Sequence, residues 1–64
     1  MSDSERDKVI AYLEQLDASR RRRILNTLDS FAEWMEDVLT WVFIKVRRVI
    51  REFFNGLQEF FGFT

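Results

Sequence analysis

The side chains of this chain that could do chemistry are carboxylates, hydroxyls and guanidinium groups. The sequence has no histidine and no cysteine, so it lacks the commonest general base and the thiolate nucleophile. Glu33, Glu36 and Asp37 lie close together in sequence. A calcium ion takes about six to eight oxygen ligands, and a catalytic carboxylate pair needs a cleft. We therefore interpret these acids as a solvated helix face and predict no enzyme activity, no cofactor and no metal site.

The strongest local run of charge is Arg20–Arg23. Phosphate groups of nucleic acid or of anionic lipid bind basic patches. Consecutive residues of a helix point in different directions, so these four arginines do not form one patch. We expect Arg22 and Arg23 to project outward and Arg21 to lay its stem over the hydrophobic end of the helix. Because the net charge is −1, nucleic acid is a disfavoured partner.

Trp34 and Trp41 are seven residues apart, so they lie on one side of a helix. Lys45 and Arg48 are close to them in sequence. Tryptophan flanked by cations is typical of protein-binding hot spots and of cation–π contacts. Alternatively, the two rings only widen the buried face of a homo-oligomer. We predict a surface for a protein partner, with five contact residues: Trp34, Trp41, Ile44, Phe54 and Phe61.

The segment 45–63 combines basic residues with several phenylalanines. Such a segment can bind a membrane interface, so peripheral membrane association is the alternative function. The same aromatic residues could also pack in a core. The anionic-surface contacts would be Arg22, Arg23, Lys45, Arg47, Arg48 and Arg51. The longest uncharged stretch, Val38–Ile44, has seven residues, whereas a membrane span needs about 20. We expect a cytoplasmic protein. Under the alternative function, the protein would associate with the surface of a membrane.

The spacing of apolar residues predicts an all-α fold in one small domain, residues 1–64. A first helix over about 4–16 buries Val9, Leu13 and Leu16, and Asp17 or Ser19 caps the next helix. The short connection makes the first two helices an antiparallel hairpin. Residues 1–3 and 62–64 are expected to fray.

One apolar stripe continues from Ile24 to Phe60 in steps of three or four residues. Its constant phase predicts a single long second helix, about 20–54. The alternative is a break near 29–30, because Ser30 to Glu33 resembles a capping box. Asn55–Gly56 is the expected stop, followed by a short C-terminal helical turn.

A helix of 35 residues is about 52 Å long, whereas the first helix is only about 20 Å long. The first helix would leave an apolar row uncovered, and monomers rarely expose such a row. The sequence therefore predicts a homodimer, with an antiparallel four-helix-type bundle that places acidic beside basic residues. Its interface would contain Leu39, Val42, Val46, Val49 and Phe53. The expected function is that of a small non-enzymatic adaptor or regulator that acts by self-association and protein–protein interaction.

Overall fold

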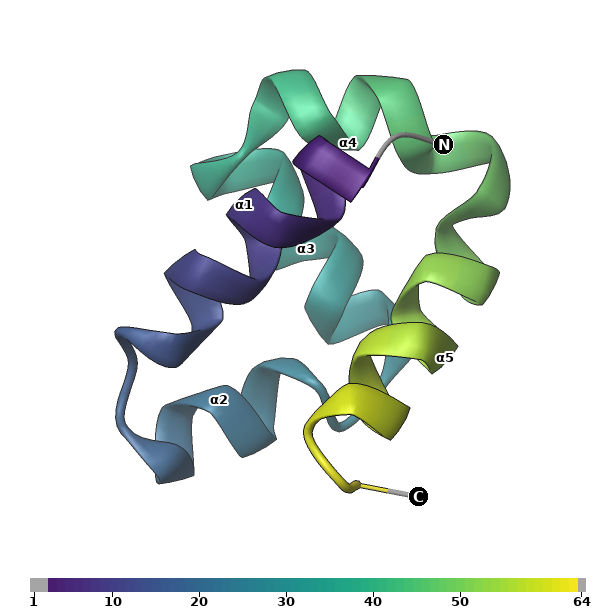
Figure 1. Cartoon of the computed structure of the whole chain (residues 1–64). Coiled ribbons are helices and arrows are strands. Elements are labelled where there is room, and N and C mark those ends of the chain that lie inside the picture. Colours follow the sequence, from purple (N-terminus) through teal and green to yellow (C-terminus); the bar gives the residue numbers. More distant parts are fainter. Residues whose placement is uncertain (1–2, 64) are drawn as a thin grey trace.

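Five α-helices and one 3-10 turn form the part of the chain that the computed structural model describes, residues 3–63. The elements are α1 (Asp3–Glu14), α2 (Ala18–Ile24), α3 (Leu28–Val38), α4 (Thr40–Val46), η1 (Arg47–Val49) and α5 (Ile50–Phe60). Figure 1 shows these short helices arranged around a common centre, with α3 in the interior of the view. The all-helical fold class is therefore confirmed.

The first helix and its connection agree closely with the sequence prediction. α1 ends at Glu14, two residues before the expected end. Asp17 is the N-cap of α2, and its Oδ1 accepts a hydrogen bond from the Arg20 backbone N–H at 2.8 Å. This bond satisfies one of the backbone donors that a helix start leaves free.

The prediction of one long helix over 20–54 is wrong. The chain interrupts it at 25–27, at Leu39 and at η1, and the largest dimension of the Cα trace is 27 Å. The alternative break near 29–30 lies too late in the sequence, because Thr27 is the N-cap of α3. Thr27 Oγ1 accepts from the Ser30 backbone N–H at 3.0 Å. The expected hairpin is therefore replaced by a globule of short helices.

Burial of the apolar stripe explains these interruptions. Each break removes a few backbone hydrogen bonds, which are worth about 1 kcal/mol net each. Each large apolar side chain that becomes buried gains about 1.5–3 kcal/mol. Leu39 itself departs from helical geometry (φ −128°, ψ 54°) and is buried. Folding the stripe back on itself is thus favoured over leaving it on a straight helix.

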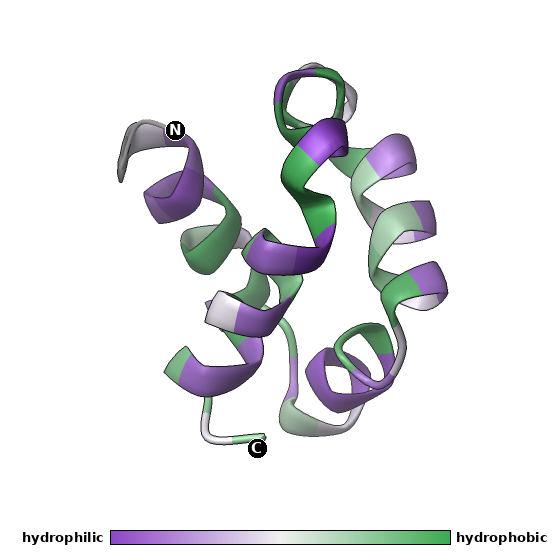
Figure 2. Ribbon diagram, turned by 90° about the vertical axis from the view of Figure 1, so that its right-hand side faces the viewer, coloured by the Kyte–Doolittle hydropathy of each residue, from purple (hydrophilic) through white to green (hydrophobic). Residues whose placement is uncertain are grey.

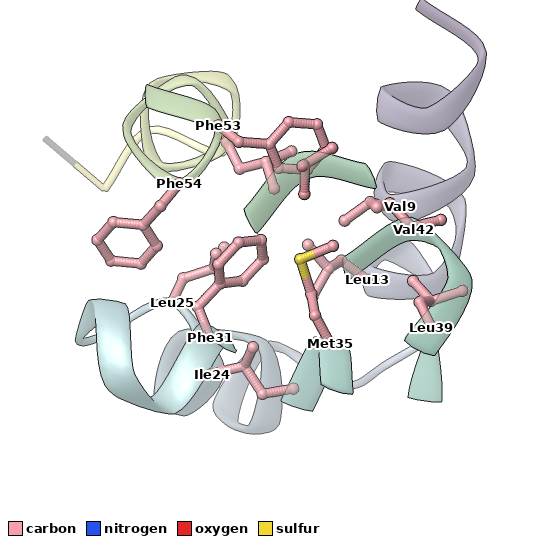
Figure 3. Packing of buried hydrophobic residues seen from close by; sticks show 12 residues of the cluster. Val9, Leu13, Ile24, Leu25, Phe31, Met35, Leu39, Val42, Phe53 and Phe54 are labelled. Atoms are coloured by element: carbon pink, nitrogen blue, oxygen red, sulfur yellow. The ribbon is translucent and has the colours of Figure 1, made fainter. Parts of the chain in front are cut away.

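The core centres on Phe31 and contains side chains from every α-helix. The Phe31 ring lies 5.5 Å from the Phe54 ring and 6.3 Å from the Phe53 ring, centroid to centroid. Figure 3 shows these rings of α3 and α5 facing one another beside Met35. The hydropathy colours in Figure 2 change between hydrophobic and hydrophilic residues along each helix, as expected for helices around one core.

Gly62, rather than Asn55–Gly56, ends the last helix. α5 continues through Gly56 to Phe60, whereas Gly62 has a positive φ of 75°. The Gly62 N–H donates to the Glu59 carbonyl and the Phe63 N–H to the Gln58 carbonyl. This pair of bonds is a Schellman motif, which favours glycine at the left-handed position.

The two ends of the chain were predicted to fray. Residues 1, 2 and 64 lie outside the described residues. Asp3 is already helical, and the backbones of Gly62 and Phe63 are hydrogen-bonded. Fraying of these residues therefore stays a prediction.

Candidate binding surface on helix α4

Helix α4 carries two large apolar side chains that the core does not cover. Trp41 is 45% exposed and Ile44 is 58% exposed, whereas Val42 and Val46 of the same helix are buried. Val38, the last residue of α3, comes shortly before α4 in the chain and is 47% exposed. The spacing of three between Trp41 and Ile44 makes them neighbours on the outer side of α4. We call the surface formed by Val38, Trp41 and Ile44 the α4 patch.

Two lysines hold the indole ring of Trp41 from different helices. Lys8 Nζ of α1 lies 4.7 Å from the ring centroid, and Lys45 Nζ of α4 lies 5.9 Å from it. Both distances are within the range of cation–π attraction. Fixing the ring in this way reduces the side-chain entropy that a partner would have to overcome on binding.

Lys45 also links α4 to the start of α1. Its Nζ donates to Glu5 Oε1 at 3.2 Å. This hydrogen bond, with the charges of Lys45 and Lys8, lowers the pKa of the Glu5 carboxyl below its ordinary value. Because Lys45 is mostly exposed, the ion pair orients α1 on α4 more than it stabilises the fold.

Charged residues of opposite sign precede and follow α4 in the chain. Glu36 and Asp37 are exposed at the end of α3, and Arg47 and Arg48 are exposed in η1. The Thr40 hydroxyl donates to the Glu36 backbone carbonyl, which connects the last turn of α3 to the first turn of α4. Along the chain, the exposed residues therefore have the order acidic, apolar, basic from α3 to η1.

The structure separates the five residues predicted to contact a protein partner. Trp41 and Ile44 lie together and exposed. Trp34 is partly buried against Phe31 and lines a shallow groove between α2 and α3. Phe61 is partly buried beneath the guanidinium group of Arg21, 5.2 Å away. The surface position expected for Phe54 is wrong, because α5 packs across α3 and buries its ring in the core.

The row predicted as a dimer interface lies mainly inside the monomer. Leu39, Val42, Val46 and Phe53 are buried by the chain's own helices. Val49 alone of this row is exposed, at 38%. These four buried side chains cannot reach a partner without opening the fold, so the geometric reason for expecting a dimer through this row is absent.

The arginines and lysine predicted to meet an anionic surface are all exposed. They lie on two separate parts of the fold. Arg22 and Arg23 belong to α2. The other four belong to the segment from the end of α4 to the start of α5: Lys45, Arg47, Arg48 and Arg51. Arg21 differs from these six, because its guanidinium group covers Phe61 and its Nη1 donates to the Leu13 carbonyl at 3.3 Å. The six cations therefore do not form one patch.

The aromatic residues of the segment 45–63 are mostly turned inward. Phe53, Phe54 and Leu57 are buried, whereas Phe60 is 51% exposed beneath the Arg6 guanidinium group. Within residues 3–63, no helix is both long enough and apolar enough to cross a membrane. The membrane-binding face expected from this segment is thus much smaller than the sequence suggests.

The chemistry available in the described residues is that of a surface rather than a ligand cavity. None of the polar or charged side chains described there is buried, and no group of three acids gathers in a way that could hold a metal ion. A hollow beside the C-terminal end is lined by Asn26, Gln58 and Phe63, among others. The Gln58 amide there already donates to the Leu25 carbonyl at 2.9 Å, which joins α5 to the turn before α3.

Sequence reasoning missed three residues of this surface: Glu5, Lys8 and Val38. Lys8 and Trp41 are far apart in sequence, and no local spacing indicates that α1 lies across α4. Val38 is apolar like the residues of the stripe. It lies directly before the break at Leu39 and outside the core. The sequence signal that was available is the adjacency of Trp41, Ile44 and Lys45.

Comparison with known proteins returned no matching family model, no matching curated protein and no matching solved structure.

Proposed function

We propose that this chain is a small non-enzymatic binding protein, of the adaptor or regulator type, that docks through the α4 patch. The observation that carries the proposal is the exposure of Trp41 and Ile44 on a helix whose other side fills the core. A chain that buries Phe31, Met35 and Leu57 completely nevertheless keeps a tryptophan at its surface. A cytoplasmic location remains part of this proposal.

The setting of Trp41 supports a role in protein recognition. Tryptophan is among the residues most enriched at interface hot spots. Here the ring is held by Lys8 and Lys45, so it presents one face in a defined position. Apolar surface surrounded by charged residues is also the composition expected of an interface centre with a polar rim.

Peripheral membrane binding through 45–63 has less support. Its main apolar side chains, Phe53 and Phe54, pack in the core, and interfacial binding scales with the apolar area that enters the membrane. We therefore retain a protein, rather than a lipid surface, as the partner class.

Site-specific photo-cross-linking in cells that express the chain tests the proposal. Benzoylphenylalanine replaces Ile44 in one variant and Phe60 in a control, since both positions are exposed and apolar but lie on different helices. We expect a discrete protein adduct from position 44 and none from position 60. The absence of an adduct from position 44, with both variants folded by circular dichroism, would refute the proposal.

A further inference from the structure

We infer that the α4 patch, together with the adjoining side of α1, binds an acidic segment of a partner protein, whose carboxylates lie beside an apolar anchor residue. This inference rests on the proposed function and names the chemistry of the partner. The observation that carries it is the pair of ammonium groups beside the exposed Trp41 ring, one from α1 and one from α4. An apolar site with two adjacent cations is complementary to an apolar side chain with adjacent anions.

The contacts between α1 and α4 show that the two helices run in opposite directions where they meet. Glu5 of α1 pairs with Lys45, near the end of α4. Lys8, about one turn later in α1, lies over Trp41, about one turn earlier in α4. Tyr12 follows one turn after Lys8 on the same side of α1, and it is 45% exposed. The surface beside Trp41 therefore continues over α1 and includes a second exposed aromatic ring.

The cations at this contact are exposed, whereas the anion is covered. The Lys45 side chain is 62% exposed, but the Glu5 side chain to which it is bound is only 13% exposed. Lys8 is exposed too, and among residues 3–63 no carboxylate forms a salt bridge with it. The charge that a partner meets nearest to the Trp41 ring is therefore positive.

One short segment can reach both ammonium groups. They lie 4.7 and 5.9 Å from the same ring centroid, so the distance between them is at most the sum, about 10.6 Å. Acidic residues one helical turn apart, or on alternate positions of an extended segment, have Cβ atoms about 5–7 Å apart. Their side chains span the remaining distance. An apolar residue beside these acids would then lie against Trp41 and Ile44.

The number of cations favours an acidic protein segment over a surface of phosphate groups. Basic segments that bind anionic lipid contain about four to eight lysines or arginines, and nucleic-acid interfaces neutralise about six to ten phosphates. Here two lysines surround one ring, and one of them is already paired with Glu5. Two cations held in fixed positions by two helices suit a partner whose carboxylates are also fixed.

Selection from a displayed library of random peptides tests the inference without a known partner. Peptides of about 16 residues are long enough to bind as a helix or as an extended segment, and the full chain is the bait. We expect the selected peptides to share acidic residues within about four positions of one another and a large apolar residue beside them. Fluorescence anisotropy then measures each affinity, which should fall at least about fivefold from about 50 to 500 mM sodium chloride because salt screens exposed charges.

Variants of Lys8 separate its positive charge from the rest of the surface. Lys8→Glu should weaken binding of the selected peptides at least about tenfold. Lys8→Arg keeps the charge and the cation–π contact, so it should weaken binding less than about twofold. Arg22→Glu makes the corresponding change of charge on α2 and should leave the affinity unchanged. Circular dichroism shows whether each variant is folded, which we expect because both positions are exposed.

Aromatic substitutions locate the bound segment. Trp41→Ala should abolish peptide binding, and Tyr12→Ala should weaken it about three- to tenfold. Phe60→Ala is the matched control, because Phe60 is an equally exposed aromatic residue on α5. We expect no change in affinity from this control, and a loss equal to that of Trp41→Ala would contradict the proposed location.

The outcomes distinguish the inference from the proposed function. The inference is overturned if no peptide is selected, if the selected peptides lack acidic residues, or if their affinity is the same for Lys8→Glu. It is also overturned if the chain selects no acidic peptide but binds phosphatidylglycerol vesicles through Lys8. In each of these cases a protein adduct from position 44 would still support the proposed function.

Discussion

Replacement of Val42 by alanine tests whether α4 is buried by the chain itself. Val42 is fully buried, whereas Ile44, two residues later in the same helix, is 58% exposed. Val42→Ala and Ile44→Ala therefore remove aliphatic groups from opposite sides of one helix. Both changes raise helix propensity slightly, so their difference reports burial.

The expected loss follows from the transfer and cavity terms. Two methyl groups at about 0.8 kcal/mol each give about 1.6 kcal/mol. A cavity of about 40–50 Å³ adds about 1 kcal/mol, and the gain in helix propensity returns about 0.5 kcal/mol. The net loss of about 2 kcal/mol is large for a domain of this length, whose stability should be about 3–10 kcal/mol.

Thermal unfolding followed by circular dichroism measures this difference. Val42→Ala should lower the midpoint by about 8–16 °C. Ile44→Ala should change the free energy of unfolding by less than about 0.5 kcal/mol. Equal effects of the two substitutions, or a larger effect at Ile44, would refute the burial of the stripe within one chain.

Three further predictions concern helix ends and the Glu5 ion pair. Gly56→Ala should stabilise the fold by about 0.5–1 kcal/mol, since an added Cβ meets nothing within 4 Å. Gly62→Ala should destabilise the fold by about 1 kcal/mol, because the φ of Gly62 is 75°. Urea unfolding that ranks the two variants the other way would contradict the assignment of Gly62 as the helix stop. Asp17→Ala should cost about 1 kcal/mol by removing the bond to the Arg20 N–H, and Ser19→Ala is the matched control. The pKa of Glu5 is lowered in the folded state, so its contribution is present above the ordinary value of 4.5 and is lost as the pH falls through the lowered value. Glu5→Gln should therefore be less stable than the parent at neutral pH, and thermal midpoints should converge in acid; a gap that is constant with pH would argue against the ion pair.

The sequence predicted the composition of the core better than the course of the backbone. Phe31, Met35, Val42 and Leu57 were assigned to one apolar stripe and are buried. Their phase persists across the breaks because every short helix must face the same core. A constant phase therefore does not show that a helix is continuous, and neither proline nor glycine marks the breaks within 20–54.

The candidate site was predictable only where it depends on local sequence. Trp41 and Ile44 depart from the phase of the stripe, which makes them candidates for exposure, and the structure exposes both. Trp34 departs from it too but is partly buried. The contact of Lys8 with Trp41 and the burial of Phe54 against Phe31 depend on how helices cross. The packing of the whole chain decides how helices cross. The spacing of residues within one helix carries no information about that packing.

The brevity of the helices has a consequence for how this molecule falls apart. Within residues 3–63 the longest helix, α1, has 12 residues, and isolated helices shorter than about 12–15 residues are marginal in water. No segment can therefore persist once its neighbours leave, and a peptide covering α4 alone should be a random coil. Loss of native structure should then be all-or-none, because every element depends on the same small set of central side chains.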